Sequence, residues 1–462
     1  MTDQDIVIIG CGAGGGTAAQ FARKTDRKAQ ITIFEKGKYP QYSKCGLPYV
    51  ISGAIPKPSD LIEFNEEWFK KARIDLHLNT IVEHIDHKKQ VITAKKQDGS
   101  VIKKPYTSLI IATGAQPTLP PIENILKNEK PINGVFTLRT LNDAETIQSF
   151  IKKDSNATVI GAGLIGMEMA DCLHTKEMNV TIVEALPMIL ANTLDKELST
   201  PIQDKIKENI SIYTDHLAIA IESKDNNITS LTIKDKSTNE TKKIPTDLLI
   251  IATGTKPEIF LSQQAGCDIG ETGCIIVDNH SGTSVENIYA VGDCTEFKEY
   301  ITKRPVRIGL GSITVRQAIA AGIHAAGGTY TLPDGVLQTC TSEFFGIEIA
   351  SVGPSATVLS DIEIITGKHI GSSLPTYFPG GKPITLKMMI NAKTGQILSA
   401  QAVGVNAAQR INTYATAILS NMTIEKFRKL ETAYAPPIAP TLDVVTLAAD
   451  IAAMKLDRKQ RQ

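Results

Sequence analysis

The amino-acid sequence predicts an α/β protein in which two similar βαβ modules are combined with a C-terminal α+β domain. An apolar strand at residues 5–9 leads into a glycine-rich turn, and the same pattern returns at residues 158–166. An apolar run ending in Ala-Thr-Gly also occurs twice, at residues 112–114 and 252–254. This internal duplication indicates two copies of one parallel-sheet module.

The composition excludes several classes of protein. The length of 462 residues allows about three domains. The chain has 49 Lys and Arg against 49 Asp and Glu, so it lacks the basic excess of a nucleic-acid-binding protein. No apolar run approaches the roughly 20 residues of a membrane span, and the N-terminus has no secretory signal pattern. We therefore expect a globular, cytoplasmic protein.

The seven cysteines argue in the same direction. Their number is odd, no pair forms Cys-x-x-Cys, and their spacings suit neither a zinc site nor a disulfide framework. We therefore expect a reducing compartment and no metal site.

The first glycine-rich turn has the spacing of a dinucleotide-binding motif. Gly10 permits the tight turn, Gly12 lets the backbone approach a pyrophosphate, and Gly15 allows close packing of helix and strand. The helix that follows, expected from about residue 14 to residue 24, offers unpaired N–H groups to phosphates. Glu35 follows the next strand, where a carboxylate accepts hydrogen bonds from ribose hydroxyls. These features predict a Rossmann-like domain.

The second motif has the same context, with Gly161, Gly163, Gly166 and Glu184 in the corresponding positions. Two like charges about 4 Å apart repel by roughly 4 kcal/mol at an effective dielectric constant near 20. A 2′-phosphate beside Glu184 would meet repulsion of this kind, and no arginine follows immediately. The second site is therefore predicted to favour NADH over NADPH.

The Ala-Thr-Gly turns and the segment Tyr-Ala-Val-Gly-Asp at residues 289–293 resemble those of flavoproteins with two dinucleotide-binding domains. In that family the first site binds FAD and the second binds NAD(P)H. The resemblance places Asp293 at the ribityl chain of the flavin. It divides the chain into a first FAD-binding part (1–117), an NAD(P)H-binding domain (118–247), a second FAD-binding part (248–327) and a C-terminal dimerisation domain (328–462).

The chain around Cys45 resembles the single-cysteine branch of pyridine nucleotide-disulfide oxidoreductases. Its Cys-Gly-Leu-Pro-Tyr segment has no second cysteine four or five residues away. This branch contains coenzyme A disulfide reductases, CoA persulfide or polysulfide reductases, NADH oxidases and NADH peroxidases. In these enzymes the cysteine lies at a helix start against the flavin. A helix N-terminus and the adjacent Lys44 would both lower the pKa of the Cys45 thiol, and the thiolate is the nucleophile.

Three segments favour the coenzyme A disulfide reductases within this branch. Ala13 stands where oxidases and peroxidases usually carry a histidine, and the segments around Tyr377 and Tyr434 resemble the tyrosine segments of the CoA enzymes. There, tyrosines act on the cysteine of the partner subunit, which implies a homodimer and makes both tyrosines catalytic candidates. Phe378 departs from the pattern, because a second tyrosine is common at that position.

The resemblance implies the following reaction. NADH reduces FAD, the flavin passes two electrons to Cys45, and the thiolate attacks a small disulfide, persulfide or polysulfide through a mixed disulfide. No rhodanese-like segment is recognised after the third domain, which favours CoA disulfide or another low-molecular-weight disulfide. Coenzyme A needs cations for its phosphates, and the candidates are Arg23, Lys24, Lys44 and Arg316.

The other cofactor-binding residues follow from the same resemblance. Glu168 resembles an acid near the nicotinamide. The remaining positions, which adjoin the motifs above, are Lys36, Ser43, Thr113, Gly114, Gly254 and Gly292.

Three alternatives stay open at this point. The first is an NADH oxidase or peroxidase in which Cys45 cycles through a sulfenic acid. The second is an electron-carrier reductase that docks a protein, which would need no cysteine at the flavin. The third is a non-catalytic dimer that senses NADH.

Overall fold

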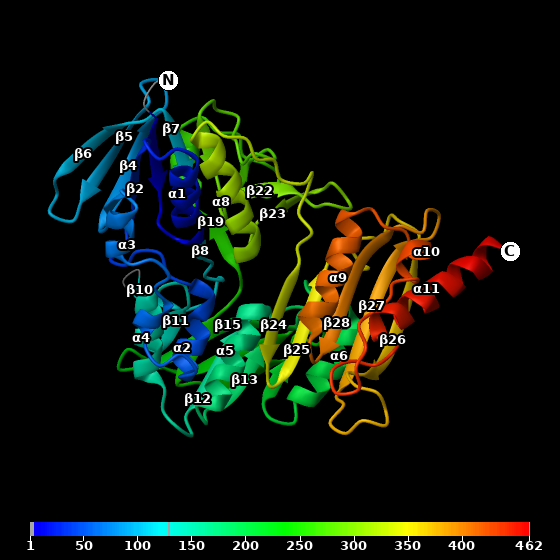
Figure 1. Cartoon of the computed structure of the whole chain (residues 1–462). Helices are drawn as coiled ribbons and strands as arrows, with labels where there is room; N and C mark the ends of the chain where they lie inside the picture. Colours follow the sequence, from blue (N-terminus) through cyan, green and yellow to red (C-terminus); the bar gives the residue numbers. More distant parts are fainter. Residues whose placement is uncertain (1–3, 128–129, 462) are drawn as a thin grey trace. The chain divides into compact units, whose positions relative to one another are not determined.

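The computed structural model describes residues 4–127 and 130–461, and the chain forms two compact units (Figure 1). Each unit combines segments that lie far apart in the sequence. Unit 1 consists of Met1–Thr118, Leu138–Gln148 and Gly254–Val336, and unit 2 consists of Leu119–Thr137, Ser149–Thr253 and Leu337–Gln462.

Unit 1 is organised around a parallel sheet of strand order β21-β7-β1-β2-β3. The strand expected at the N-terminus is β1 (Asp5–Ile9), which pairs with β2 (Gln30–Phe34) on one side and β7 (Ser108–Ile111) on the other. Four of its five residues are buried, which is why the run is continuously apolar rather than alternating. The outer strands are β3 (Asp75–His77) and β21 (Ile288–Ala290).

Helices α1 (Ala13–Thr25) and α8 (Gly311–Ala325) pack against each other in unit 1 (Figure 1). Small residues line their contact. A Cβ atom added to Gly322 would lie 2.3 Å from the carbonyl oxygen of Ala18, so the backbones touch where the helices meet. The beginning of α1, which carries the first glycine motif, is thereby fixed to the rest of the unit.

Three smaller sheets complete unit 1, with strand orders β4-β5-β6, β8-β19 and β20-β22-β23. Helix α4 continues past Gln148, where the chain passes into unit 2. The remaining elements are η1 (Lys44–Gly46), α2 (Leu47–Ser52), η2 (Pro58–Leu61), α3 (Glu66–Lys71), β4 (Thr80–Asp86), β5 (Val91–Lys96), β6 (Val101–Pro105), β8 (Ala115–Pro117), α4 (Leu141–Phe150), β19 (Thr255–Pro257), α7 (Phe260–Gln264), β20 (Ile275–Ile276), β22 (Thr295–Lys298) and β23 (Pro305–Arg307).

Unit 2 contains a second parallel sheet with a matching order, β11-β18-β12-β13-β14. Its central strand β12 (Asn156–Ile160) lies between β13 (Asn179–Val183) and β18 (Leu248–Ile251), as β1 lies between β2 and β7. The predicted duplication of an α/β module is confirmed. The predicted boundary at residue 247/248 is wrong, because β18 pairs with β12 and so belongs to the second module rather than to the second part of the first.

The same unit carries the other elements of this module. Among them, the strands β15, β16 and β17 form an antiparallel sheet. The elements are β9 (Leu126–Lys127), β10 (Lys130–Pro131), β11 (Val135–Thr137), α5 (Leu164–Thr175), α6 (Lys196–Ile206), β14 (Ser211–Tyr213), β15 (His216–Lys224), β16 (Asn227–Asp235) and β17 (Thr241–Pro245).

The C-terminal segment of unit 2 forms the expected α+β domain, built on an antiparallel sheet of order β24-β25-β28-β27-β26. The strand expected at 385–390 lies within β27. Helix α9 packs on β25 and β28, and α11 packs on β26 and β27. The elements are β24 (Cys340–Phe344), β25 (Ile347–Val352), β26 (Ile364–Ser372), β27 (Pro383–Asn391), β28 (Ile397–Gly404), α9 (Ala407–Leu419), α10 (Ile424–Phe427) and α11 (Val444–Gln460).

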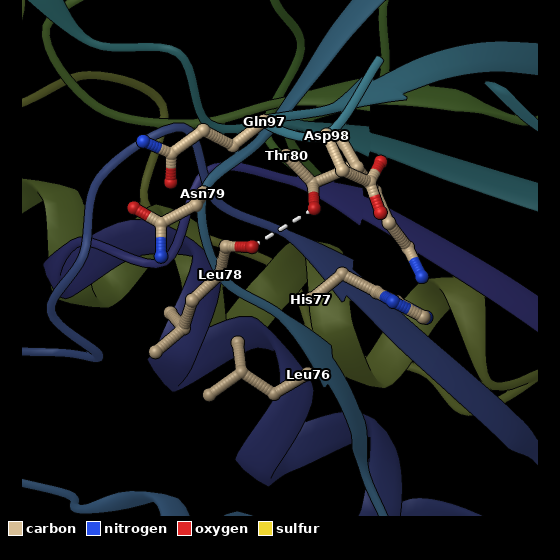
Figure 2. A pocket seen from close by; sticks show the side chains of 8 residues that line it. Leu76, His77, Leu78, Asn79, Thr80, Gln97 and Asp98 are labelled. Atoms are coloured by element: carbon tan, nitrogen blue, oxygen red, sulfur yellow. Dashed lines mark hydrogen bonds between the residues drawn. The ribbon is translucent and has the colours of Figure 1, made fainter. Parts of the chain in front are cut away.

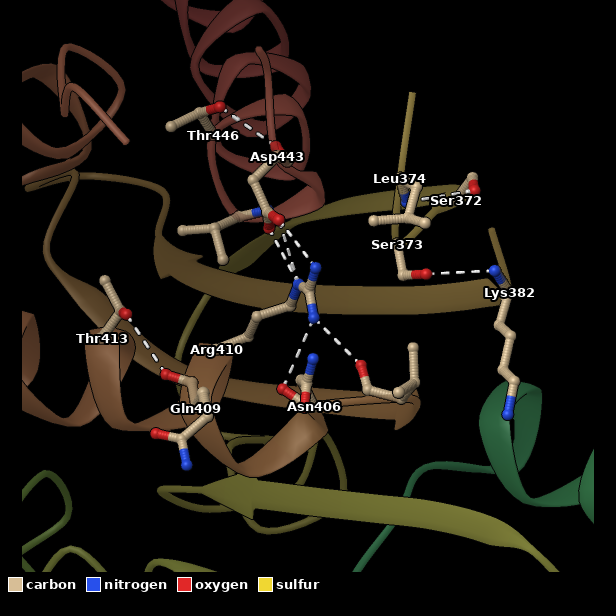
Figure 3. A network of polar contacts seen from close by, with 12 residues as sticks. Ser372, Ser373, Leu374, Lys382, Asn406, Gln409, Arg410, Thr413, Asp443 and Thr446 are labelled. Atoms are coloured by element: carbon tan, nitrogen blue, oxygen red, sulfur yellow. Dashed lines mark hydrogen bonds and ion pairs between the residues drawn. The ribbon is translucent and has the colours of Figure 1, made fainter. Parts of the chain in front are cut away.

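A buried ion pair joins the two long helices of this domain (Figure 3). Arg410 of α9 donates from Nε and Nη2 to the carboxylate of Asp443, at 2.9 and 2.8 Å, and from Nη1 to the carbonyl oxygen of Val405 at 3.0 Å. Asp443 also caps α11 by accepting the N–H of Val445. Both charges are hydrogen-bonded on several sides, which is the condition under which a buried pair is tolerated.

No helix in the described part of the chain is long and apolar enough to cross a membrane.

Candidate active site

The two glycine-rich turns have nearly the same geometry. Gly10 has φ of +99°, and a Cβ there would lie 2.4 Å from the carbonyl oxygen of Ala112; a Cβ on Gly15 would lie 1.8 Å from the carbonyl oxygen of Gly10. In the second turn Gly161 has φ of +97°, and a Cβ on Gly166 would lie 2.0 Å from the carbonyl oxygen of Gly161. The Ala-Thr-Gly segment of each module therefore contacts the glycine turn of the same module. Only glycine fits at the first and last positions of each motif.

The middle glycine of each motif faces open space. A Cβ on Gly12 or on Gly163 would meet no atom within 4 Å. Each is the N-cap of the following helix, α1 or α5, and neither helix has a side-chain cap. The N–H groups at these helix ends are thus left for an anionic ligand, and the missing side chains leave room for a pyrophosphate.

Two carboxylates end the second strand of the modules in matching positions. Glu35 accepts the N–H of Cys11 at 2.6 Å and the N–H of Gly37 at 2.7 Å. Glu184 accepts the N–H of Ala162 at 2.6 Å and that of Leu186 at 2.7 Å. Each carboxylate is fixed at the glycine turn and retains lone pairs that can accept from ribose hydroxyls.

An arginine that the sequence did not single out lies at the first module. Arg139 Nη2 donates to Asp293 Oδ2 at 2.7 Å, and a Cβ on Gly114 would lie 3.3 Å from Nη2. Arg139 Nε is buried and has no hydrogen-bond partner among the described residues. A buried cationic donor of this kind fits a phosphate group. No local pattern marks Arg139, because its partners come from residues far along the chain.

Lys44 belongs to the same group of charges. Desolvation by the surrounding residues, and next the positive charge of Arg139, lower the pKa of Lys44 to about 8, against the opposing effect of Glu35 and Asp293. The side chain itself is exposed. Lys44 is therefore mostly charged at pH 7 and loses its charge over the pH range in which an ordinary thiol ionises.

Cys45 is the cysteine whose side chain is exposed, whereas the others are buried or half-buried. It lies in the turn η1, directly before α2 and Pro48. Its Sγ is 3.9 Å from the position that a Cβ on Gly311 would take, at the first residue of α8. The fifteen-residue α8 thus begins beside the sulfur, and the positive end of a helix stabilises a thiolate.

The other cysteines are buried or half-buried, as packing residues are. Burial raises the pKa of Cys172 to about 12 and that of Cys294 to about 11, and it raises the pKa of Cys11 still further. Within residues 4–127 and 130–461, no three His, Cys, Asp or Glu side chains group together as metal ligands.

The two candidate tyrosines lie together in the C-terminal domain. The hydroxyl oxygens of Tyr377 and Tyr434 are 2.6 Å apart, although 57 residues separate them in the sequence. This hydrogen bond raises the pKa of Tyr377. Both rings are exposed, 68% for Tyr377 and 47% for Tyr434, so the pair is open to a partner or a substrate.

The four cations expected to bind CoA differ in their surroundings. Arg23 donates to the carbonyl oxygens of Ala72, Asp26, Arg27 and Arg73, so its guanidinium is already used to hold the end of α1. This geometry argues against the predicted phosphate contact of Arg23. Lys24, whose ammonium lies 4.4 Å from the centre of the Phe21 ring, is exposed, and so are Arg316 and Lys44.

Of the remaining predicted residues, Glu168 lies in α5 and Ser43 precedes η1, whereas the others follow the ends of parallel strands. Thr113 donates to the carbonyl oxygen of Glu258 at 2.7 Å, and Gly292 donates its N–H to Gln317 at 2.9 Å. Glu168 in α5 accepts a hydrogen bond from Ser342 of β24 at 2.6 Å. Lys36 is exposed, Ser43 is half-buried immediately before η1, and Gly254 has φ of +98° with no atom near its missing Cβ.

A pocket of about 570 Å³ in unit 1 is lined by Leu76–Thr80 and Lys96–Asp98 (Figure 2). It lies at the end of β2, since Glu35 donates its N–H to the carbonyl oxygen of His77 and accepts the N–H of Thr80. The His77 ring stacks on Phe34 with centres 4.9 Å apart. The pocket therefore borders the end of the first module rather than the residues around Cys45.

Together these features define a class: an α/β oxidoreductase with two dinucleotide sites and an exposed cysteine in the first unit. The chain belongs to the pyridine nucleotide-disulphide oxidoreductase family, whose sequence profile matches residues 4–322, while the profile of the family's dimerisation domain matches residues 339–445. Members of this family are FAD-dependent enzymes that use NAD(P)H, and this chain is one of them.

Three similar proteins indicate which members of the family this chain resembles. An NADH oxidase of Methanocaldococcus jannaschii is 35% identical over 460 residues, which cover 98% of this chain and 99% of the relative. A CoA-dependent NAD(P)H sulfur oxidoreductase of Pyrococcus abyssi is 33% identical over 450 residues, covering 96% and 97%. The structure of an NAD-dependent persulfide reductase from A. fulgidus superposes with a TM-score of 0.92 at 33% identity, covering 98% of this chain and 84% of that one.

Proposed function

We propose that this chain is an NADH-preferring reductase of coenzyme A disulfide or a related low-molecular-weight disulfide, persulfide or polysulfide, with Cys45 as its redox-active thiol. The observation that carries the proposal is the exposed Cys45 at the start of α8 in an FAD-dependent enzyme. No Cys-x-x-Cys or longer dithiol pattern adjoins it in the sequence, so its disulfide partner must come from the substrate.

The Cys45 thiolate attacks one sulfur of the substrate disulfide. The substrate S–S bond breaks, a mixed disulfide with Cys45 forms, and one thiolate leaves and takes up a proton. FAD, when bound, carries the electron pair of NADH to the sulfur. Two electrons and one proton then release the second thiol and restore the Cys45 thiolate, so that NADH and one proton reduce one disulfide to two thiols.

The residues around Cys45 stabilise its thiolate. The N-terminus of α8 and the charge of Lys44 favour the anion, and Lys44 does so most strongly below its pKa of about 8. We assign the proton delivery to the hydrogen-bonded pair Tyr377 and Tyr434, acting on Cys45 of the other subunit of a homodimer. Exposed hydroxyls in a dimerisation domain suit this role.

The first module's residues suit FAD. The open Gly12 and the N-terminus of α1 accept a pyrophosphate, Glu35 accepts from ribose, and Arg139 Nε offers an unused donor. Lys24 and Arg316 remain as cations for the phosphates of CoA.

Arg139→Met is expected to weaken FAD binding by about tenfold to a hundredfold, since a charge-assisted hydrogen bond to phosphate would be lost. Equilibrium titration of the flavin-free protein with FAD measures the change. The exposed Arg316→Met is the matched control and should leave FAD affinity unchanged. Equal FAD affinities for the wild type and Arg139→Met would remove Arg139 from the flavin site.

Glu184→Arg is expected to raise the ratio of NADPH to NADH use by about tenfold to a hundredfold, because the like charge beside the 2′-phosphate is replaced by an opposite one. Steady-state kinetics with both dinucleotides gives the ratio. Glu184→Gln removes the negative charge but keeps an oxygen that can accept the N–H of Ala162. This variant therefore tests the charge without removing the hydrogen bond that supports the turn. An unchanged ratio of NADPH to NADH use in both variants would show that Glu184 does not distinguish the two dinucleotides.

A second candidate function is NADH oxidation by oxygen or peroxide with a Cys45 sulfenic acid, which the similarity to an NADH oxidase favours. Intact-mass measurement of protein purified without reductant, with peptide mapping of Cys45, separates the two. A CoA adduct on Cys45 supports the disulfide reductase. A sulfenic or higher oxide without CoA supports the oxidase or peroxidase.

A further inference from the structure

Helix α5 of the second module packs along β24, the first strand of the C-terminal domain. Ser342 Oγ donates to Glu168 Oε1 at 2.6 Å, burial raises the pKa of Asp171 while the backbone N–H of Phe345 opposes that rise, and the Phe345 ring centre lies 5.6 Å from the centre of the His174 ring. The three helix residues are spaced by three and so follow one side of α5. The C-terminal domain therefore contacts α5, the helix that begins at the second glycine turn.

The ionisation of Glu168 is governed by two opposing influences. Burial raises the pKa of Glu168, and the hydrogen bond from Ser342 lowers it. The other titratable groups on the facing elements are Asp171, Cys172 and His174 on α5 and Cys340 and Glu343 on β24, whereas β12, β13 and β18, which also contact α5, carry none.

We propose that Ser342 is a positioning residue that holds Glu168 as a fixed carboxylate for the nicotinamide ring, so that the C-terminal domain completes the NADH site. This inference rests on the proposed function and on the resemblance that gives Glu168 a place near the nicotinamide. When NADH gives up a hydride, which is a proton with two electrons, its ring becomes a cation. An ionised Glu168 stabilises that cation, and a protonated Glu168 does not.

The geometry supports the assignment of Ser342 as the residue that holds Glu168. Glu168 Oε1 is bound by Ser342, which leaves the lone pairs of Oε2 available to a ligand. Ser342 is only 9% exposed, so water does not readily replace its hydroxyl. Without this donor, burial still raises the pKa of Glu168 and nothing from Ser342 opposes it. The protonated form of Glu168 is then more populated.

The test compares the wild type with Ser342→Ala in the holoenzyme. Titration calorimetry measures the dissociation constant of NAD⁺ across pH 5–9, and anaerobic stopped-flow measures flavin reduction by NADH over the same range. We expect NAD⁺ affinity and reduction rate to fall as the pH drops through the pKa of Glu168. In Ser342→Ala the midpoint of both curves should move upward by about one pH unit, with wild-type values at the alkaline end.

Three further variants serve as controls. Ser342→Thr keeps a hydroxyl and should restore the wild-type midpoint. Thr341→Ala removes the neighbouring hydroxyl of β24, which donates to the carbonyl oxygen of Ile349, and should cause no shift. Glu168→Gln should abolish the pH dependence altogether.

The outcomes distinguish this inference from the function on which it rests. If Glu168→Gln keeps the pH dependence, Glu168 does not lie at the nicotinamide, and both proposals about it fail. If Glu168→Gln abolishes it but Ser342→Ala leaves the midpoint unchanged, or weakens NAD⁺ binding equally at every pH, only the role of Ser342 is overturned. Because flavin reduction involves no disulfide, an error about the electron acceptor leaves this test intact.

Discussion

Replacement of Cys45 by serine is expected to lower disulfide reduction by at least about 1,000-fold while FAD binding and flavin reduction by NADH persist. Serine has nearly the same size, but its hydroxyl neither ionises near neutral pH nor forms a mixed disulfide. The side chain is exposed at the start of α8, so the change disturbs no core packing. Turnover with CoA disulfide and anaerobic flavin reduction are the two measurements.

Cys340→Ser provides the matched control. Cys340 is half-buried, and burial raises the pKa of its thiol, so it should contribute nothing to the exchange reaction. Wild-type disulfide turnover in Cys45→Ser would disprove the mechanism. A loss in both variants would point to a general effect of thiol removal rather than to a role of Cys45.

The substitution with the largest expected effect on stability is Lys387→Met. The Lys387 ammonium donates to Asp195 Oδ2 at 2.7 Å and lies 2.6 Å from Glu197 Oε1, and the side chain of Lys387 is 6% exposed. Burial lowers the pKa of Lys387, but the two carboxylates outweigh it and hold the pKa above its usual value. Removing this cation leaves Asp195 buried without its counter-charge, at a cost of about 3–5 kcal/mol.

The location of this network adds to its importance. Asp195 stands at the N-cap position of α6 in the second module, Lys387 lies in β27, and Gln401 of β28 both donates to Asp195 and accepts its N–H. The network joins the second module to the C-terminal domain within unit 2. We expect the midpoint of chemical unfolding, followed by far-UV circular dichroism, to fall accordingly.

Lys368→Met is the control for this prediction. Lys368 is the register partner of Lys387 on β26 and lies 3.6 Å from Glu197, but its side chain is 30% exposed. A partly exposed pair of this length contributes about 1 kcal/mol or less. Equal losses in the two variants would show that burial of the pair around Asp195 is not what stabilises unit 2.

Local sequence patterns predicted the two modules well, and the reason is short-range geometry. Gly10 and Gly161 adopt positive φ, while Gly15 and Gly166 touch backbone within their own turn, so the spacing alone defines each structure. The fold class, two α/β modules with an α+β domain, followed from this duplication and is confirmed by the matching strand orders.

Assignments that depend on distant partners were less predictable. The domain boundary placed the strand β18 with the wrong module, because its pairing with β12 links residues about 90 positions apart. Arg23 appears in the sequence as an available cation, but residues directly after α3 and α1 supply carbonyl oxygens that accept its hydrogen bonds. Arg139 was missed because Asp293, its partner, lies 154 residues away.

The sequence by itself determined the two glycine turns, the carboxylates Glu35 and Glu184, and the candidate thiol Cys45. These features reside in short segments whose backbone conformation and side-chain chemistry are fixed locally. Only the tertiary structure decided which groups surround them: Arg139 beside Asp293, Gly311 beside Cys45, and Ser342 on Glu168. Such contacts form when separate strands and helices pack together within a unit, and their energies depend on burial that a sequence pattern does not contain.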